Sequence, residues 1–374
     1  MLDTYFGGHF KDANVLVTGH TGFKGSWLCC WLHVLGARVA GVSKDVPTVP
    51  SHFEAIGLDE MLDDQRLDIR DAAALESLVK KVRPRFLFHL AAQPIVQLSY
   101  EDPTYTIETN VMGTVNVLSA LRKADIDCTA VLITSDKCYE NNEWIWGYRE
   151  NDRLGGKDIY SASKAAAETL IRAYVGSFLS DSRCSVRVGI GRAGNVVGGG
   201  DWAPYRLVPD CVRAWSATED VIIRNPASTR PWQHVLEPLS GYLSLAQHLT
   251  EKDDLHGEAF NFGPSNDSNH MVSDLIAEIS KSWDKAQWRN AGTGKDQLYE
   301  AGLLKLNCDK AANLLRWGPV LTFSETVEMT ANWYKAFYQT SGANMLAHSL
   351  EQIRAYCELA TQRQAPWSLP QGTR

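Results

Sequence analysis

Short runs rich in β-branched and aromatic residues alternate with stretches of helical periodicity through the first half of the chain. The runs predict strands at Asn14–Thr18, Arg38–Val42, Phe86–Leu90, Ala130–Ser135 and Ser185–Gly189. The helical stretches are Gly25–Leu35, Ala72–Lys81, Thr104–Lys123 and Tyr160–Phe178. Strands that alternate with helices form a parallel sheet covered on both faces. The pattern therefore predicts an α/β fold with a doubly wound parallel sheet.

This alternation ends at a glycine-rich and aromatic segment, GGGDWAPYRLVPD, which mixed short strands and helices follow. We expect a first domain over residues 1–195 and a smaller, discontinuous substrate-binding region over 196–374. Segments near 221–238 and 259–264 are expected to return to the first domain. The last part of the chain predicts one helix, Ser349–Ala360, and then a polar tail to which we assign no role.

Length and charge narrow the class of protein. The 374 residues suffice for a core that encloses both a cofactor and a substrate. The 37 basic and 44 acidic side chains give a net charge of −7, which makes nucleic acid and anionic membranes poor partners. The longest apolar runs have about six residues, as in Trp27–Leu32, whereas a membrane-spanning helix needs about 20. The first residues lack a cationic segment followed by an apolar one, so we expect a cytoplasmic location.

The cysteines and histidines do not form a metal-binding pattern. None of the eight cysteines is spaced as CxxC, so we interpret them as reduced core thiols. His20, His89 and His234 have no carboxylate or cysteine at ligand spacing. No metal is predicted.

Three glycines, Gly19, Gly22 and Gly25, stand where the first predicted strand gives way to the first helix. Glycine allows a tight turn and a close approach of the backbone to a pyrophosphate, and the helix start offers unpaired N–H groups. The segment therefore predicts a Rossmann-type dinucleotide site. Its expected cofactor-binding residues are Gly19, Thr21, Gly22, Phe23, Lys24 and Gly25.

The sequence indicates less clearly whether the dinucleotide is NAD or NADP. An acid at the end of the second strand would bind the ribose 2′-hydroxyl, but the strand ends Gly41–Asp45, with the acid late and Lys44 before it. NAD is favoured and NADP stays open. Asp68 and Ile69 are candidate adenine contacts. The alternative for Asp68 is that it caps the helix that follows.

Tyr160 and Lys164 are four residues apart at the start of an alanine-rich helix, so both project from one face. A phenol is a weak base at neutral pH, and a nearby cation stabilises the phenolate and lowers the phenol pKa. We therefore expect Lys164 to activate Tyr160 as a base.

The glycine turn, Leu90–Ala92, Asn110–Thr114 and the Tyr160/Lys164 pair together resemble the extended short-chain dehydrogenase/reductases. The resemblance covers most of the chain. It implies the Rossmann fold, bound NAD, cofactor contacts from Leu90, Ala91 and Ala92, and Lys164 as a ligand of the nicotinamide ribose.

Within that family, three segments are similar to the nucleotide-sugar 4,6-dehydratases: Thr18–Trp27, Thr134–Tyr139 and Arg230–Val235. This likeness implies a nucleotide-sugar substrate, CDP-glucose, which loses water across C5 and C6 after oxidation at C4. The cytidine base comes from the likeness alone. The rival interpretations are a nucleotide-sugar epimerase and a non-catalytic dinucleotide sensor.

The triplet Ser135-Asp136-Lys137 stands at the carboxyl end of the predicted strand Ala130–Ser135, where open parallel sheets present their chemistry. By resemblance, Ser135 contacts the substrate hydroxyl, Asp136 protonates the departing 6-hydroxyl and Lys137 removes the C5 proton. Related dehydratases carry Thr-Asp-Glu there, so a lysine replaces a carboxylate base. A lysine acts as a base near neutral pH only after burial or a neighbouring cation lowers its pKa. A coupled Asp136/Lys137 pair and a plain salt bridge are the alternatives.

Six arginines gather in the stretch that should form the second wall of the cleft: Arg187, Arg192, Arg206, Arg213, Arg224 and Arg230. Diphosphates favour such forked donors. Arg206 and Arg230 lie in motifs of the resembled family and are the first choices. Asn195 is an expected phosphate contact and Gln93 an expected sugar contact. The apolar positions of the predicted helices 104–123 and 160–178 also favour a homo-oligomer, either a dimer or a tetramer.

Overall fold

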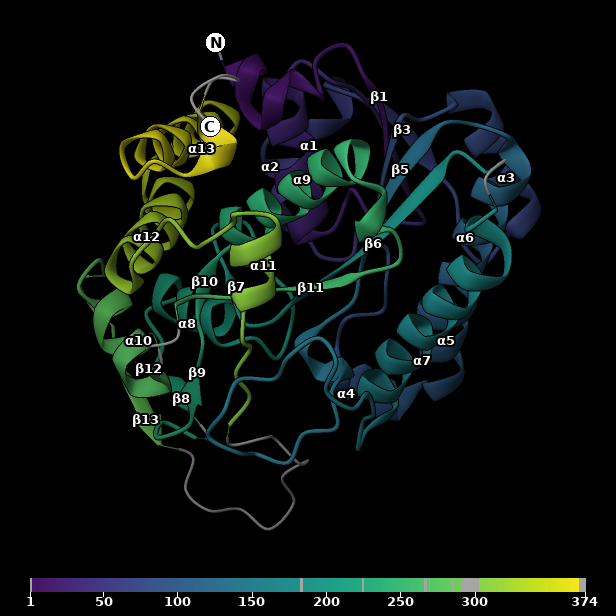
Figure 1. Cartoon of the computed structure of the whole chain (residues 1–374). Helices are drawn as coiled ribbons and strands as arrows, with labels where there is room; N and C mark the ends of the chain where they lie inside the picture. The colour runs from purple at the N-terminus through teal and green to yellow at the C-terminus, as the bar shows by residue number, and fades with distance from the viewer. Residues whose placement is uncertain are drawn as a thin grey trace.

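A parallel sheet of seven strands forms the centre of the computed structural model (Figure 1). The structure describes residues 2–181, 184–223, 225–265, 268, 270–283, 286–290 and 303–369. The strand order is β11-β6-β5-β4-β1-β2-β3, and every neighbouring pair is parallel. The strands are β1 (Asn14–Thr18), β2 (Arg38–Ser43), β3 (Asp63–Arg66), β4 (Phe86–His89), β5 (Cys128–Ile133), β6 (Val186–Ala193) and β11 (Ala259–Phe262).

Helices cover both faces of this sheet. The longer helices of the described chain, including those of its second half, are α1 (Phe23–Val34), α3 (Ala72–Val82), α6 (Gly113–Ala124), α7 (Ile159–Tyr174), α8 (Leu207–Ser216), α9 (Leu236–Glu251), α10 (Val272–Ser280), α12 (Phe323–Gln339) and α13 (Met345–Gln362). The short ones are α2 (His52–Ala55), α4 (Val96–Glu101), α5 (Pro103–Ile107) and α11 (Asp309–Leu314). Figure 1 shows α3, α6 and α7 on one side of the sheet and α1 and α9 on the other. The doubly wound parallel fold is therefore confirmed.

The sequence of β1 explains how the sheet supports two cores. Val15 and Val17 point into the core beneath α1 and α9, whereas Leu16 points into the core beneath α3, α6 and α7. All three side chains are fully buried. Successive side chains of a strand face opposite ways, so an unbroken apolar run is what a strand with helices on both faces requires.

The predicted boundaries of strands and helices need three changes. The edge strand β3 was not predicted because all of its residues are polar, as an exposed edge tolerates. The predicted helix 104–123 is divided by a π-helical turn, Glu108–Met112, between α5 and α6. A second π-helical turn, Val175–Leu179, continues α7.

The second half of the chain adds a smaller layer of short strands and helices. The segment Ala259–Phe262 pairs with β6 and extends the main sheet as β11. By contrast, β8 (Val221–Ile223) pairs with β13 (Trp288–Asn290) in a separate ribbon instead of returning to the main sheet. Two further ribbons join β7 (Val196–Val197) to β10 (Gln233–His234) and β9 (Thr229–Arg230) to β12 (His270–Met271).

The C-terminal helix α13 packs against α1, the helix that follows the glycine turn. The rings of Trp31 and Tyr356 lie 5.6 Å apart at this contact. His52 connects the two helices because its Nδ1 lies 2.9 Å from the Ser26 hydroxyl and its Nε2 lies 3.1 Å from the Ser349 hydroxyl. The end of the chain therefore supports the start of α1.

All eight cysteines carry free thiols, and six of them are buried. In the part of the chain that the structure describes, no helix is both long and apolar enough to cross a bilayer.

Three buried histidines make the stability of the fold depend on pH. Burial lowers the pKa of His52, His89 and His234 from 6.5 to about 3. As the pH falls, these histidines are therefore protonated in the unfolded chain before they are protonated in the folded protein. The stability that the neutral histidines contribute is complete above pH 6.5 and is lost as the pH falls toward 3. The free energy of unfolding in urea should drop by about 1.4 kcal/mol per pH unit and per histidine below pH 6.5. In a His52→Asn variant the free energy of unfolding should fall less steeply with decreasing pH, by about 1.4 kcal/mol per pH unit. An unchanged pH dependence would show that His52 does not contribute to it.

Candidate active site

The glycine turn lies between β1 and α1, at the carboxyl edge of the sheet. Gly19 has a positive φ of 78°, and a Cβ there would lie 2.6 Å from the Ala91 nitrogen. A Cβ on Gly25 would collide with the Gly19 carbonyl. No side chain caps α1, whose N-cap is Gly22, so its first N–H groups are available to an anion. The turn therefore fits the pyrophosphate of a dinucleotide.

The neighbouring strand ends support this turn. The Leu90 nitrogen donates to the Thr18 carbonyl, and the Ala91 nitrogen donates to the Thr18 hydroxyl. Thr21 is held at the end of β2, because its hydroxyl donates to the Asp45 carbonyl and its nitrogen donates to the Ser43 hydroxyl. The predicted cofactor residues from β1 and β4 thus meet at one edge. Asp45 takes part here through its backbone.

The next part of the edge follows β3. Asp68 forms an ion pair with Arg70 at 2.8 Å, and Ile69 is buried against Gly113. The alternative that Asp68 caps α3 is wrong, because Asp71 is the N-cap and accepts a hydrogen bond from the Ala74 nitrogen. Asp68 and Ile69 stay candidate adenine contacts.

Tyr160, Ser135 and Asp136 form a buried cluster where α7 begins beside the end of β5. Their exposed fractions are 7%, 6% and 4%. The Ser135 hydroxyl donates to Asp136 Oδ1 at 2.9 Å and accepts the Lys137 N–H at 3.2 Å. The same hydroxyl is among the groups that act on the pKa of the Tyr160 phenol. Asp158 caps α7 by accepting the Ser161 N–H, which fixes the start of the helix.

Burial dominates the electrostatics of the phenol. It raises the pKa of Tyr160 from 10.0 to about 12, and the nearby Asp136 adds to the rise. The Ser135 hydroxyl and the charge of Arg206 act in the opposite direction and lower the pKa. Burial thus outweighs the neighbouring charges at the phenol, and the activation of Tyr160 by Lys164 stays a prediction. Lys164 itself has a pKa lowered by burial to about 8, and its Nζ reaches the Ile133 carbonyl at 3.5 Å.

Lys24 contributes a second, half-buried ammonium, which was expected only as part of the phosphate turn. Its Nζ lies 3.4 Å from the Tyr242 hydroxyl of α9. Burial lowers its pKa to about 7, and the charges of Lys164 and Arg206 add to the decrease, whereas Asp136 opposes it. The side chain of Lys24 therefore points into the catalytic cluster. The signal in the sequence is a lysine within the glycine-rich turn that precedes the first helix.

Lys137 differs from Ser135 and Asp136 in its exposure to solvent. Its side chain is exposed, so the burial that would suit a lysine base is missing from this structure. The structure describes no ion pair between Lys137 and Asp136, which removes the plain salt bridge from the alternatives. A Cβ on Gly194 would collide with the Asp136 carboxylate, so the backbone just after β6 also confines that carboxylate.

Three of the candidate substrate residues, Arg206, Asn195 and Arg230, lie in or just before the second half of the chain. Arg206 is near the cluster: it forms an ion pair with Asp201 at 2.9 Å and acts on the charge of Tyr160. Asn195 follows β6 with a positive φ of 50°, and its carbonyl accepts the Gln233 N–H. Arg230 lies on β9, and its guanidinium donates to the Thr229 carbonyl.

Gln93 has a structural function here, against the expectation of a sugar contact. Its amide donates to the Thr106 hydroxyl at 2.8 Å, and its side-chain oxygen accepts the Ile95 N–H at 2.6 Å. Its side chain is thus used to order the loop after β4.

Only part of the predicted arginine group lies near the cluster. Arg187 pairs with Asp253 and Arg213 pairs with Asp210, both at least partly exposed. Arg224 lies outside the described residues. Arg192 is fully buried and forms its ion pair inside the protein, with Glu168.

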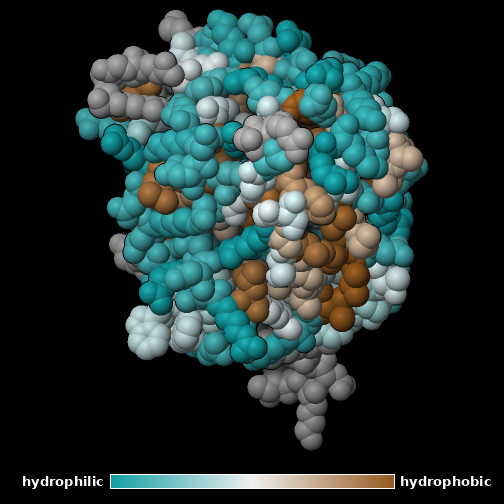
Figure 2. Space-filling model, turned by 45° about the vertical axis from the view of Figure 1, so that its right-hand side comes forward, coloured by the Kyte–Doolittle hydropathy of each residue, from teal (hydrophilic) through white to brown (hydrophobic). Residues whose placement is uncertain are grey.

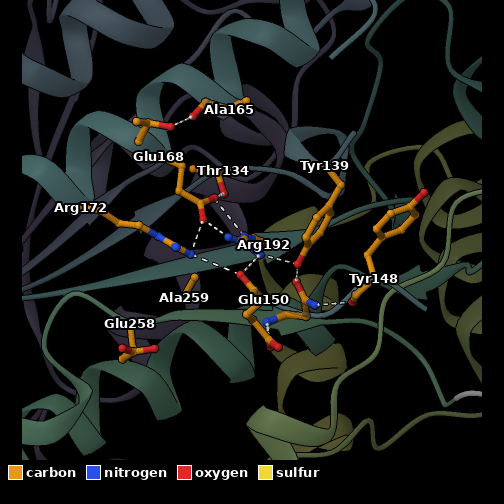
Figure 3. Close-up of polar contacts among 12 residues, drawn as sticks. Thr134, Tyr139, Tyr148, Glu150, Ala165, Glu168, Arg172, Arg192, Glu258 and Ala259 are labelled. Carbon is orange, nitrogen blue, oxygen red and sulfur yellow. Dashed lines mark hydrogen bonds and ion pairs between the residues drawn. The ribbon is translucent and has the colours of Figure 1, made fainter. Parts of the chain in front are cut away.

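Figure 3 shows the buried network around Arg192, which the sequence analysis did not identify. Arg192 forms an ion pair with Glu168, and both side chains are fully buried. Arg192 also donates to the Tyr139 hydroxyl, and Arg172 donates to Glu168 at 3.3 Å. The Thr134 hydroxyl donates to Glu168 at 3.1 Å, so the network holds the residue before Ser135.

The position of Glu168 could have been noticed from spacing. It follows Tyr160 and Lys164 at intervals of four residues, so all three share one face of α7. That face contacts the end of β5. One helix thus supplies both the candidate catalytic pair and the carboxylate that holds the strand end in place.

The sheet, the glycine turn and the buried Tyr160/Lys164 pair together define a Rossmann-type α/β protein with a dinucleotide site. A model of the family described as GDP-mannose 4,6 dehydratase matches residues 16–330. This chain therefore belongs to the GDP-mannose 4,6-dehydratase family.

Two curated relatives extend this result. The CDP-glucose 4,6-dehydratase of Salmonella typhimurium is 44% identical over 367 residues, which cover 97% of this chain and 100% of the relative. The dTDP-glucose 4,6-dehydratase of Shigella flexneri is 25% identical and covers 86% of this chain and 92% of its own.

Solved structures of nucleotide-sugar epimerases share the fold. UDP-glucose 4-epimerase of Thermotoga maritima has a TM-score of 0.74 at 22% identity, over 87% of this chain and 100% of the other. UDP-glucuronic acid 4-epimerase of Bacillus cereus, solved with UDP-glucuronic acid and NAD, has a TM-score of 0.73 at 22% identity, over 87% and 99%.

Loss of the Glu168 charge should destabilise the protein strongly. A Glu168→Gln variant leaves the Arg192 guanidinium buried without its counter-ion, which costs about 3–5 kcal/mol. The matched control is Arg172→Met, which removes a partly exposed partner of the same carboxylate and should cost about 1 kcal/mol or less. Urea unfolding of both variants measures the difference. Equal losses would contradict a special role for the buried pair.

Proposed function

We propose that this protein is an NAD-dependent CDP-glucose 4,6-dehydratase that forms CDP-4-keto-6-deoxyglucose for deoxysugar synthesis. The observation that carries the proposal is the buried carboxylate of Asp136, which is hydrogen-bonded to Ser135 beside Tyr160. An epimerase needs a base at C4 but has no water to eliminate, so it has no use for an acid at this place. The 44% identity to the Salmonella dehydratase over nearly the whole chain supports the same reaction and nucleotide.

The chemistry that NAD would supply when bound is the transfer of a hydride from C4 of the sugar and its return to C6. The residues of this chain that would hold it are the glycine turn from Gly19 to Gly25, the segment Leu90–Ala92, and Lys164 at the nicotinamide ribose. Asp68 and Ile69 would contact the adenine. A tight turn and an uncapped helix start suit the pyrophosphate, as the geometry of α1 provides.

The chain's own groups supply the proton chemistry. Tyr160 takes the proton of the 4-hydroxyl, which Ser135 contacts. The C4 ketone makes the C5 proton acidic, and Asp136 protonates the 6-hydroxyl as it leaves as water. Lys137, alone or coupled with Asp136, is the candidate base for C5. Because Lys137 is exposed in this structure, substrate must cover it before it can act in this way.

The second half of the chain forms the other wall of the proposed substrate site. We divide the chain into a cofactor domain over 1–195 and a substrate region over 196–374. Arg206 is the best-placed diphosphate ligand, since it is the arginine whose charge acts on Tyr160. Asn195 and Arg230 complete the proposed set. The enzyme is assigned to the cytoplasm.

Incubation with CDP-glucose tests the proposed function directly. The product should absorb in alkali, as 4-keto-6-deoxy sugars do, and a 4-epimer would not. In a panel of CDP-, dTDP-, UDP- and GDP-glucose, the CDP sugar should give the highest kcat/KM. Tyr160→Phe should lower kcat by at least about 100-fold, because it removes a general base. Conversion of CDP-glucose to CDP-galactose, or cofactor binding without turnover, would replace the proposal by the epimerase or the sensor.

We also propose that the protein is a homo-oligomer through the face formed by α4, α5 and α7. Exposed apolar side chains gather on these neighbouring elements, and Figure 2 shows the hydrophobic surface on this side. They are Leu98, Tyr100, Ile107, Met112, Leu170 and Phe178. Pairing would remove this surface from water.

Sedimentation analysis should find a dimer or a tetramer. Ile107→Glu places a charge on the proposed interface and should give monomers. The matched control is Ile222→Glu on β8, whose side chain is 69% exposed, and this variant should assemble normally. A monomeric wild-type protein, or assembly that Ile107→Glu does not affect, would refute the interface.

A further inference from the structure

The two oxygens of the Asp136 carboxylate are held in different ways. Oδ1 accepts the Ser135 O–H at 2.9 Å. Among the described residues Oδ2 accepts no hydrogen bond, and it is the atom that a Cβ on Gly194 would meet first. The backbone of Gly194 therefore lies directly against the oxygen that remains to carry the proton. The orientation of this oxygen depends on where Gly194 lies.

Gly194 stands just beyond the paired part of the sheet. The last pair between β6 and β11 joins Ala193 to Phe262. Asn195, the residue after Gly194, has a positive φ of 50°, a left-handed conformation that few residues other than glycine adopt. The pairing of the strands therefore does not fix this turn, and an additional contact is needed to hold it against Asp136.

Gln233 of β10 supplies this contact from the second half of the chain. Its side-chain nitrogen donates to the Gly194 carbonyl at 3.0 Å and to the Phe262 carbonyl at 2.9 Å. Its backbone N–H donates to the Asn195 carbonyl at 3.2 Å. The side-chain amide thus joins the carboxyl ends of β6 and β11, and the residue as a whole binds two successive carbonyls of the turn.

The side chain of Gln233 is used only as a donor. The amide nitrogen has two hydrogens, and the two strand-end carbonyls take both of them. The residue is 2% exposed, so water does not compete for these bonds. The side-chain oxygen has no hydrogen-bond partner in the described part of the chain. A glutamine with these contacts is suited to hold the backbone of the turn.

We propose that Gln233 is a positioning residue for Asp136, which holds Gly194 against the carboxylate and thereby orients the acid toward the departing 6-hydroxyl. This inference rests on the proposed dehydration. In that step the C5 proton leaves to the base and the electron pair of the C5–H bond forms the C5–C6 double bond. The C6–O bond breaks, and the oxygen leaves as water with the proton of Asp136.

The position of the acid affects only part of this reaction. A general acid must lie within hydrogen-bond reach of the atom that it protonates, so a displaced carboxylate slows the loss of water. The oxidation at C4 and the removal of the C5 proton do not use the proton of Asp136. A defect in Gln233 should therefore depend on the leaving group at C6.

The test compares two substrates that differ in their need for an acid. The 6-hydroxyl of CDP-glucose needs a proton to leave, whereas the fluorine of CDP-6-deoxy-6-fluoroglucose leaves as fluoride without one. Gln233→Met keeps the approximate length of the side chain and removes both donors. The kcat for each substrate is measured in the wild-type protein and in the variant. Bound NAD and circular dichroism establish that the variant is folded.

The matched control is Gln247→Met on α9. Gln247 is also a buried glutamine whose nitrogen donates, to Glu251 at 3.1 Å, and whose oxygen has no partner among the described residues. It lies outside the proposed active site. This variant should keep kcat for both substrates within about twofold of the wild-type values, since the general acid is not displaced.

Gln233→Met should lower kcat for CDP-glucose by at least about tenfold, which is part of the roughly 100-fold or more that a general acid contributes. Its kcat for the fluoro sugar should stay within about twofold of the wild-type value, because fluoride needs no acid. A loss for the fluoro sugar that equals or exceeds the loss for CDP-glucose, or no loss for either, would overturn the positioning role.

A second variant serves if Gln233→Met does not fold. Gln233→Asn keeps an amide that is too short to reach both carbonyls, and the same selective loss is expected of it. The proposed function fails separately, if the wild-type protein forms no keto sugar from CDP-glucose.

Discussion

The packing of the start of α7 against the segment that follows β5 is the constraint on which the site depends. It brings the phenol of Tyr160, the hydroxyl of Ser135 and the carboxylate of Asp136 into one buried cluster. Because the strands are parallel, their carboxyl ends meet at the same edge as the glycine turn. Glu168 of α7 forms an ion pair with Arg192 of β6 and accepts a hydrogen bond from Thr134 just after β5, which ties the helix to both strands.

Burial sets the chemistry of this edge more strongly than any single charge. It raises the pKa of Tyr160 and lowers the pKa values of Lys164 and Lys24. In each case burial disfavours the charged form. The resting site is thus expected to hold few net charges, and catalysis requires protons to move between neighbours. Asp136 is central because its negative charge raises the pKa values of both Tyr160 and Lys24, which favours the neutral phenol and the charged ammonium.

Much of the fold follows from local patterns, because the patterns and the tertiary packing agree. The run Asn14–Thr18 is a strand with its predicted bounds, and its unbroken apolar character fits a sheet covered on both faces. The polar strand β3 could not be predicted, since an exposed edge imposes no hydrophobic pattern. The segment Val221–Ile223 has the same composition as a core strand, yet its partner is β13.

The candidate site is predicted less completely than the fold. Spacing along one helix was enough to pair Tyr160 with Lys164, and the motifs located Ser135 and Asp136. Spacing does not reveal burial, so the raised pKa of the phenol and the direction of the Lys24 side chain required the structure. Arg192 was interpreted as a phosphate ligand because a sequence does not distinguish an arginine facing a cleft from one facing a buried carboxylate.

Deuterium at C4 of CDP-glucose tests the central claim, that this edge of the sheet carries out an internal oxidation and elimination. The substrate CDP-[4-²H]glucose is converted in ordinary water, and the product is examined by NMR and mass spectrometry. The account predicts that the deuterium appears at C6 of CDP-4-keto-6-deoxyglucose. Deuterium that stays at C4, or that is lost to the solvent, would contradict it.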